Sequence, residues 1–305
     1  MEEINIKEYL RSCSLSKGVY YCANAGNAGD SLIACATFQI FRDSEVPYQL
    51  YDWRKTNLEG KIFVYGGGGN LVSYYGDALR IIESVHQKVK KLIILPHTIN
   101  HHESLLKSFG SNVDIICREK VSYNYVKNKS PHANVMLMHD LVFNLKVDEL
   151  LTRNSDNYLE TIFLELIYMI KKKKHLFLNF PTLKELKYTL RKEAKLFRLR
   201  HNGNLNCFRT DCESANLKLP VDNIDVSNLL SYKKIINRAN AVWVSNQLIR
   251  LVNSFAKIKT DRLHIAICAA LLNKEVYFYK NSYYKNEAIY RFSFEKQFPN
   301  VRWMG

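Results

Sequence analysis

The sequence lacks the features of a secreted or membrane-spanning protein. No apolar segment approaches the length that crosses a bilayer, and the longest, 158–170, contains two glutamates. The N-terminus has no basic-then-apolar region of the kind found in signal peptides. The seven cysteines are odd in number and include no C-x-x-C pair. We therefore expect reduced thiols and a cytoplasmic protein.

Several binding motifs are absent as well. The glycines in the segment 24–30 are not spaced as G-x-G-x-x-G, so the dinucleotide-binding fingerprint is missing. The net charge of +15 comes without zinc-finger spacing or an aromatic RNA-binding consensus, so we expect no nucleic-acid partner. His101 and His102 are adjacent, but no carboxylate stands at ligand spacing from them. We expect no metal and no other cofactor.

What the sequence does contain is an alternation of short apolar strands with helical patterns. Such alternation is typical of parallel sheets with helices on both faces. We predict an α/β fold of two facing Rossmann-like domains of the GT-B type, residues 1–145 and 204–305, separated by a basic helical insertion at 146–203. The expected strands are 19–22, 49–53, 61–65, 91–95, 114–117, 135–138, 205–208, 241–244 and 276–279, and the expected helices are 31–41, 71–90, 103–109, 232–238, 246–255 and 260–272.

The insertion concentrates the positive charge of the chain. Between residues 171 and 201, eleven lysines and arginines accompany only two acids. Two helices are expected here, at 158–170 and 182–198, and the second has leucines on one face and basic residues on the other. Such a helix can lie on an anionic membrane surface. It is equally compatible with packing against a neighbouring domain or with a solvated basic face.

Polar residues directly follow several of the expected strands. The carboxyl ends of parallel strands share one edge, where α/β sheets bind ligands, so these residues should meet there. The segment 24–30 reads as a strand end, a glycine turn and a helix N-terminus, which is suited to an anion. Four consecutive glycines at 66–69 suggest that a group approaches the main chain closely, although a flexible loop is the simpler alternative. The residues expected at this edge are Asp30, Asn70, His97, Arg118 and Asp140.

The segment 260–272 reads as a tightly packed helix capped by Thr260 or Asp261. Its first turn contains Arg262 and His264. A cation is locally unfavourable at a helix N-terminus, so an arginine there indicates a negatively charged partner. An ordinary amphipathic helix with a satisfied histidine is the alternative.

Seven short motifs occur in the order found in the polysaccharide pyruvyl transferase family, which the sequence resembles over about residues 19–290. The family transfers pyruvate from phosphoenolpyruvate to a sugar as a ketal. His97 stands where the family more usually has glutamine, and Lys280 where it has aspartate. The motifs are G-N-A-G-D (26–30), G-G-G-N (67–70), L-P-H-T-I (95–99), R-E-K-V-S-Y (118–123), F-R-T-D-x-E (208–213), D-R-L-H-I-A-I (261–267) and N-S-Y-Y-K-N (281–286).

The resemblance implies roles for individual residues. Arginines can hold the carboxylate and phosphate of phosphoenolpyruvate as forks, and Arg118, Arg262 and Arg209 are the candidates. His264 is the candidate general acid that protonates the methylene carbon, because histidine exchanges protons near neutral pH. Asp30 is favoured as the base toward the acceptor over Asp140, although both are also suited to capping. The remaining expected contacts are Asn27, Gly68, Asn70 and His97.

The resulting hypothesis is a transferase that acts on a lipid-linked or nucleotide-linked sugar of a surface polysaccharide, such as an exopolysaccharide or capsule. The basic insertion would hold it at the inner face of the cell membrane. Two alternatives stay open at this point. One is a GT-B-type glycosyltransferase that uses a nucleotide sugar, and the other is a non-catalytic anion-binding or membrane-binding protein on the same fold.

Overall fold

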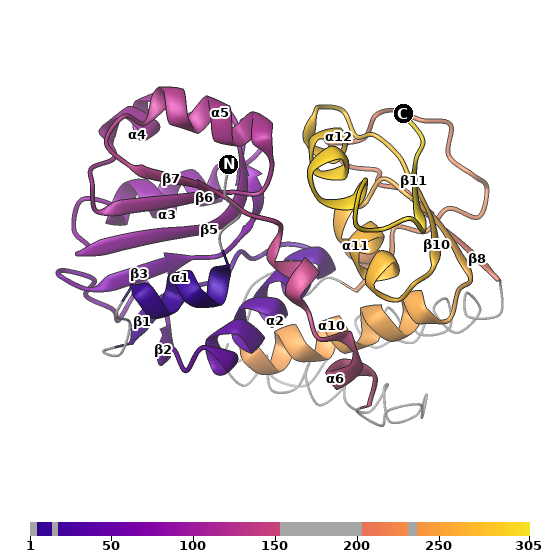
Figure 1. The fold of residues 1–305 in the computed structure, drawn as a ribbon, viewed down its shortest axis with the longest axis horizontal. Helices are drawn as coiled ribbons and strands as arrows, with labels where there is room; N and C mark the ends of the chain where they lie inside the picture. Colours follow the sequence, from indigo (N-terminus) through magenta and orange to yellow (C-terminus); the bar gives the residue numbers. More distant parts are fainter. Residues whose placement is uncertain (1–4, 14–17, 153–202, 231–236) are drawn as a thin grey trace, which may run out of the picture.

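The computed structural model describes residues 5–13, 18–152, 203–230 and 237–305. It contains two parallel β-sheets, one from each half of the chain, with helices packed around them (Figure 1). The α/β class with parallel sheets is therefore confirmed. The expected helices at 158–170 and 182–198 lie outside the described residues.

The first half forms a seven-stranded sheet in the order β2-β1-β3-β5-β6-β7, with β4 paired to β5. All its pairings are parallel. The chain adds β2 on one side of β1 and the later strands on the other, so the strand order reverses between β1 and β3, the usual place for a ligand. The strands are β1 (Val19–Cys22), β2 (Tyr48–Leu50), β3 (Ile62–Tyr65), β4 (Gly68–Leu71), β5 (Lys91–Ile99), β6 (Val113–Cys117) and β7 (Asn134–Leu137).

Helices cover both faces of this sheet, because its strands are apolar on both sides. Ile93 and Leu95 of β5 point into the core beneath α1 (Ile6–Ser12) and α2 (Ala28–Asp43). Leu92 and Ile94 point into a second core. Figure 1 shows α1 and α2 on one side of the sheet and α4 and α5 on the other. The helices of the second core are α3 (Asp77–Val85), α4 (Glu103–Ser108) and α5 (Lys120–Lys129).

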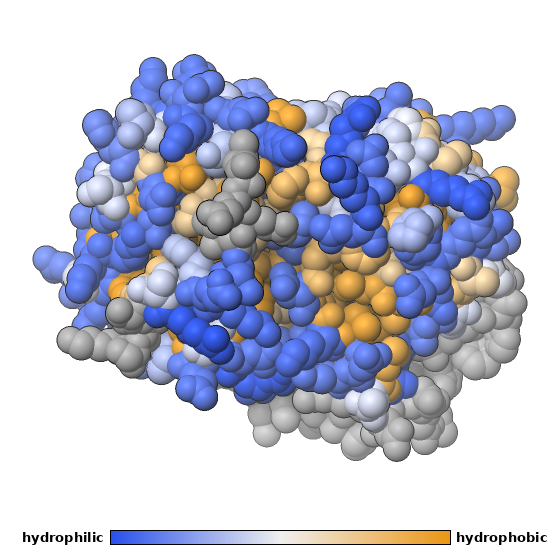
Figure 2. Space-filling model, viewed as in Figure 1, coloured by the Kyte–Doolittle hydropathy of each residue, from blue (hydrophilic) through white to orange (hydrophobic). Residues whose placement is uncertain are grey.

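The second half forms a four-stranded parallel sheet in the order β11-β10-β9-β8. Its inward residues, such as Ile258 and Phe278, are buried, whereas Lys259 on the other face is exposed. Figure 2 shows a mostly hydrophilic surface with an apolar area over this half, where Figure 1 draws α11. The elements are β8 (Asn204–Cys207), β9 (Lys257–Thr260), β10 (Glu275–Phe278), β11 (Val301–Trp303), α9 (Val226–Leu229), α10 (Arg238–Asn253), α11 (Leu263–Leu271), α12 (Lys285–Ile289) and the π-helical turn Tyr290–Phe294.

The two halves share one continuous apolar core. Helix α10, from the second half, packs along α2 of the first half, and Ser245 donates a hydrogen bond to the carbonyl of Ser31 at 3.2 Å. The 3₁₀ turn η2 (Leu141–Asn144) and helix α6 (Val147–Leu151) lead out of the first sheet toward α10, where Arg250 donates to the carbonyl of Leu151 at 2.9 Å. The expected domain boundaries at 145 and 203, and the facing arrangement of the GT-B type, stay predictions.

Three local predictions were wrong. Residues 241–244 are not a strand but part of α10, because the Asn237 side chain caps the helix by accepting from the Asn240 N–H at 2.9 Å. Ala241 and Val244 of this segment are buried together with Leu248, at helical spacing. Thr260 ends strand β9, which was not expected, and α11 begins only at Leu263. The expected helix 71–90 is limited to α3, because Leu71 still belongs to strand β4 and the residues on either side of α3, 72–74 and 86–90, form bends and turns.

Candidate active site

The candidate site lies where the carboxyl ends of the first sheet meet the start of α11. Arg118 follows β6, and its backbone N–H donates to the carbonyl of His97 in β5 at 3.1 Å. Asp140 follows β7 and caps the next turn by accepting from the Val142 N–H at 3.0 Å. His264 is the second residue of α11 and reaches this edge from the other half. Parallel topology therefore brings together residues far apart in the sequence.

His264 is held between α2 and Asp140. Its Nε2 atom lies 3.4 Å from Asp140 Oδ2. Its Nδ1 atom lies against the start of α2, where a Cβ atom on Gly29 would be only 2.4 Å away. The His264 side chain keeps 15% of its surface exposed, whereas those of Asp140 and Arg118 keep 1% and 2%. Among these three residues, His264 is therefore the one best placed to touch a substrate.

Arg118 is fixed by three neighbours. Its Nη1 atom donates to Asp140 Oδ2 at 2.7 Å, and its Nε atom donates to Thr98 Oγ1 at 2.8 Å. Its Nη2 atom lies against β4, where a Cβ atom on Gly69 would be 2.7 Å away. Burial alone would raise the pKa of the Asp140 carboxyl, but the nearby charges of His264 and Arg118 hold that pKa below its ordinary value. Asp140 is therefore a carboxylate that holds Arg118 and His264 in place.

The four consecutive glycines are not a flexible loop. Gly68 and Gly69 belong to strand β4, and each glycine is needed because the protein itself approaches the main chain. A Cβ atom at Gly67 would lie 2.8 Å from the Pro96 carbonyl oxygen, and one at Gly66 would lie 2.9 Å from the Asn24 nitrogen. The sequence predicted that some group approaches the main chain of this segment closely. In the structure that group is the protein itself, including the Arg118 side chain.

Asn70 and His97 form a partly buried network of hydrogen bonds. His97 Nε2 lies 2.9 Å from Asn70 Oδ1, and Asn70 Nδ2 donates to Asn24 Oδ1 at 3.0 Å. His97 is fully buried, and burial together with the charge of Arg118 lowers the pKa of its imidazole to about 3. A neutral, enclosed histidine is placed to support β4 and β5. Gly68, whose φ of +150° only glycine adopts readily, lies beside this network.

The two arginines of the second half already have anionic partners within the protein. Arg262 stands at the N-cap position of α11 without a side-chain capping hydrogen bond, and it pairs with Asp225 and with Asp211, the latter at 2.9 Å. Arg209 pairs with Asp211 at 2.7 Å and with Glu213. The negatively charged partner expected for Arg262 at the start of α11 is thus present within the protein, in Asp225 and Asp211. Both guanidinium groups are buried and paired with these carboxylates.

A further cation, Lys285, was missed by sequence reasoning although it lies in the motif N-S-Y-Y-K-N. Its Nζ atom pairs with Glu213. Its side chain lies beside Gly69, where an added Cβ atom would be 3.8 Å from Lys285 Cδ. Burial, partly offset by Glu213, lowers the pKa of Lys285 to about 8. Lys285 and Arg118 therefore lie against the same glycine from opposite halves of the chain. Only the fold reveals this, since the two residues are 167 positions apart in the sequence (285 − 118).

Asp30 and Asn27 form the N-terminal cap of α2. The Asn27 N–H donates to Asp30 Oδ2 at 2.8 Å, and Asn27 Oδ1 accepts from the Gly29 N–H at 2.8 Å. Burial raises the pKa of the half-buried Asp30 carboxyl, and the nearby charge of His264 opposes that rise. The expectation that Asp30 is suited to capping is confirmed. Its carboxylate also lies close enough to His264 for the two charges to interact.

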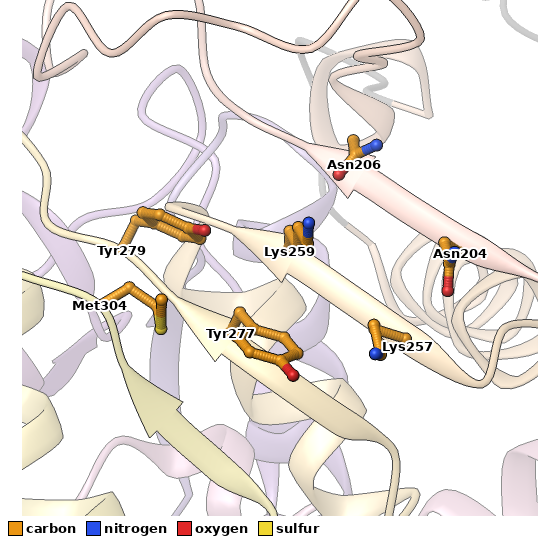
Figure 3. Close-up of a pocket in the computed structure, with 7 residues that line it drawn as sticks. All are labelled: Asn204, Asn206, Lys257, Lys259, Tyr277, Tyr279 and Met304. Carbon is orange, nitrogen blue, oxygen red and sulfur yellow. The ribbon is translucent and has the colours of Figure 1, made fainter.

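A hollow of about 310 Å³ lies elsewhere, on the open face of the second sheet (Figure 3). Its side chains rise from β8, β9 and β10, and Met304 closes one side. None of the residues expected at the active site lines it. The lining residues are Asn204, Asn206, Lys257, Lys259, Tyr277, Tyr279 and Met304.

Within the described ranges, the structure contains no cluster of three or more histidine, cysteine, aspartate or glutamate side chains that could hold a metal ion. Over the same part of the chain, no helix is both long and apolar enough to span a membrane.

Comparison with known proteins identifies the family. The model of the polysaccharide pyruvyl transferase family matches residues 27–283. A solved structure of an uncharacterised protein from Klebsiella pneumoniae subsp. pneumoniae NTUH-K2044 is similar, with 29% sequence identity and a TM-score of 0.75. That similarity covers 98% of this chain and 96% of the other. A comparison with curated proteins found no match. The chain therefore belongs to the polysaccharide pyruvyl transferase family and is a transferase enzyme.

Proposed function

We propose that the protein transfers the pyruvate of phosphoenolpyruvate to two hydroxyl groups of a sugar, forming a cyclic ketal. The observation that carries the proposal is the contact of His264 with Asp140 and Gly29, beside the buried guanidinium of Arg118. This arrangement places His264, a partly exposed group that can transfer a proton, next to the fixed positive charge of Arg118. Phosphoenolpyruvate needs both, because its carboxylate and phosphate must be neutralised while its methylene carbon is protonated.

Arg118 and Lys285 are the cations that we assign to the donor. They lie against the same residue, Gly69, and come from the two halves of the chain. Arg118 is locked by Asp140 and Thr98, so it offers a preorganised charge. Lys285 pairs with Glu213, and a flexible ammonium can leave this carboxylate for a more highly charged phosphate. Arg209 and Arg262 position Glu213 and Asp211, and act on the donor through them.

The first step forms a new carbon–hydrogen bond. His264 in its imidazolium form donates a proton to the methylene carbon, which becomes a methyl group, and positive charge develops on the neighbouring carbon that bears phosphate. Asp140 stabilises the imidazolium before transfer and holds the ring in place, as a carboxylate does for a catalytic histidine. A first sugar hydroxyl attacks the charged carbon, and a base takes its proton.

Asp30 is the group that we assign as this base. Its pKa is raised by burial, whereas the pKa of Asp140 is held down by its two cationic neighbours. The carboxylate with the higher pKa is the better proton acceptor. The bond from carbon to the phosphate oxygen then breaks, inorganic phosphate leaves with its electron pair, and the second hydroxyl closes the ketal as it loses its proton.

The acceptor belongs to a surface polysaccharide, in keeping with the family, and we propose a lipid-linked or nucleotide-linked precursor. The chain's basic segment at 171–201 supports a site near anionic membrane lipids, which attract clustered lysines and arginines. The two sheets joined by α2 and α10 are compatible with a GT-B-like pair of domains that close on donor and acceptor.

Turnover in deuterium oxide tests the proposal. Wild-type protein is incubated with phosphoenolpyruvate and a panel of methyl pyranosides. The products are followed by proton and phosphorus NMR spectroscopy. We expect release of inorganic phosphate together with a ketal whose methyl group contains one solvent deuterium. His264→Gln should release phosphate at least about 100-fold more slowly. Phosphate release without deuterium in the methyl group would contradict protonation of the methylene carbon.

A further inference from the structure

Four tyrosines gather next to the candidate active site and come from both halves of the chain. Tyr74 and Tyr75 lie between β4 and α3, and Tyr283 and Tyr284 lie between β10 and α12. The ring centroids of Tyr74 and Tyr283 are 5.9 Å apart, and those of Tyr283 and Tyr284 are 5.5 Å apart. The two segments therefore form one aromatic cluster, which we call the tyrosine cluster.

The tyrosine cluster is joined to the cations of the active site. The Lys285 ammonium lies 5.1 Å from the centre of the Tyr283 ring, and the Tyr283 hydroxyl donates to Glu213 Oε1 at 3.5 Å. Tyr75 accepts a hydrogen bond from the Cys212 thiol at 3.8 Å. Tyr284 reaches the carbonyl of Ile99, at the end of β5, at 3.4 Å. Three of the four rings are thus anchored to elements that also position Lys285, Glu213 and Arg118.

Tyr74 differs from its neighbours because 47% of its surface is exposed. The other three tyrosines are half-buried. An exposed ring beside anchored rings is a preformed platform, and tyrosine offers a large rigid surface with a polar edge at low entropic cost. Binding sites for small molecules typically combine such rings with a few fixed polar groups. Here those groups are the Glu213 carboxylate and the Lys285 ammonium.

We propose that the tyrosine cluster is the subsite for the pyranose ring of the acceptor, with Tyr74 as the stacking surface. A pyranose has an apolar face of C–H groups, which packs on an aromatic ring, and a rim of hydroxyls, which bond to carboxylate and phenol groups. Stacked on Tyr74 and Tyr283, its hydroxyls would lie on the side of Lys285 and Glu213. This inference rests on the proposed function, since that function requires a sugar beside the donor cations.

Binding of methyl pyranosides to the intact protein tests this assignment. The ligands are methyl glycosides of gluco, galacto and manno configuration, which carry no aromatic group of their own. Their weak binding is measured by saturation-transfer difference NMR, with and without phosphoenolpyruvate. Tyr74→Ala should weaken the best of them about 3- to 10-fold, because stacking on one ring is lost. Tyr74→Phe should bind within about twofold of wild type, since the ring remains. The unfolding-temperature shift given by phosphoenolpyruvate should be unchanged in both variants.

Tyr277→Ala is the matched control. Tyr277 lines the hollow on the open face of the second sheet (Figure 3), and none of the four tyrosines of the cluster lines that hollow. We expect wild-type pyranoside affinity in this variant. Loss of affinity in Tyr277→Ala with retention in Tyr74→Ala would overturn the proposal and place the sugar on the sheet face. A wild type that binds phosphoenolpyruvate but no pyranoside would also overturn it. Tyr74-dependent pyranoside binding without phosphoenolpyruvate binding would uphold the subsite and contradict the proposed donor.

Discussion

His264 packs directly on the α-carbon of Gly29, so that a methyl group on residue 29 would lie 2.4 Å from the imidazole Nδ1 atom. Gly29 is in the first turn of α2, where a side chain would otherwise be tolerated and would favour the helix. Position 29 is therefore a glycine because His264 occupies the space of a side chain, and not because the backbone conformation requires glycine. This contact joins the glycine-rich turn of the first half to the start of α11 in the second.

The first prediction is that Gly29→Ala displaces His264 while the fold is retained. We expect turnover to fall about 100-fold, as when a general acid is removed, with an unfolding temperature close to that of wild type. Steady-state phosphate release and thermal unfolding measure the two effects. Gly76→Ala is the matched control, because no atom lies within 4 Å of a Cβ atom at that position. Wild-type turnover in Gly29→Ala would show that the position of His264 does not matter.

The second prediction concerns Asp140, whose Oδ2 atom faces both Arg118 and His264. Asp140→Asn keeps the size of the side chain but leaves a buried guanidinium without its carboxylate. We expect a loss of about 3 kcal/mol in the free energy of unfolding, together with a fall in turnover. Denaturant titration measures the first quantity and phosphate release the second.

Asp43→Asn is the control for Asp140. Asp43 also pairs with cations, but the side chains of its partners Lys7, Arg42 and Lys146 keep 36%, 46% and 45% of their surface exposed. Removal of such a surface charge should cost less than about 1 kcal/mol. If Asp140→Asn were as stable and as active as Asp43→Asn, Asp140 would have neither of the roles assigned to it.

Strand–helix alternation correctly placed Arg118 and Asp140 at one sheet edge, because parallel topology fixes where strands end. It did not reveal that Arg262 and Arg209 are neutralised by Asp225, Asp211 and Glu213, since such pairs depend on how loops fold together. The sequence also did not show how accessible each side chain is, and His97, expected as a polar contact to the substrate, is fully buried.

The strand prediction at 241–244 failed for a related reason. A run of alanine, valine and tryptophan favours a strand by intrinsic preference, but burial decides in the folded protein. Residues Ala241, Val244 and Leu248 are buried at helical spacing, and they place α10 against α2. Lys285 was missed because its importance comes from Gly69 and Glu213, neither of which is near it in sequence.

The third prediction is a dependence of stability on acid pH through Glu213. Burial would raise the pKa of this carboxyl, but Lys285 and Arg209 lower it to about 2 from an ordinary value of 4.5. The folded-state pKa is thus below that of the unfolded chain. The stabilisation is present above pH 4.5 and is lost as the pH falls toward 2, with a size of about 3 kcal/mol.

Glu213→Gln should remove this part of the pH dependence and destabilise the protein at neutral pH, because the buried Lys285 ammonium loses its partner. Denaturant titrations between pH 2 and 7 measure both effects. Glu149→Gln is the comparison, since that carboxylate pairs with Arg42 on the surface. An identical pH profile in wild type and Glu213→Gln would mean that the ion pair contributes nothing to stability.

The central claim is that phosphoenolpyruvate is the donor and binds beside Lys285 and Arg118, and thermal unfolding with this ligand tests it most directly. At about 100 times its dissociation constant, phosphoenolpyruvate should stabilise wild-type protein by about 2.7 kcal/mol. We expect that gain to be lost in Lys285→Met and kept in His264→Gln, because the histidine transfers a proton and the lysine binds the anion. A shift with nucleotide sugars and none with phosphoenolpyruvate would contradict the account and favour a glycosyltransferase.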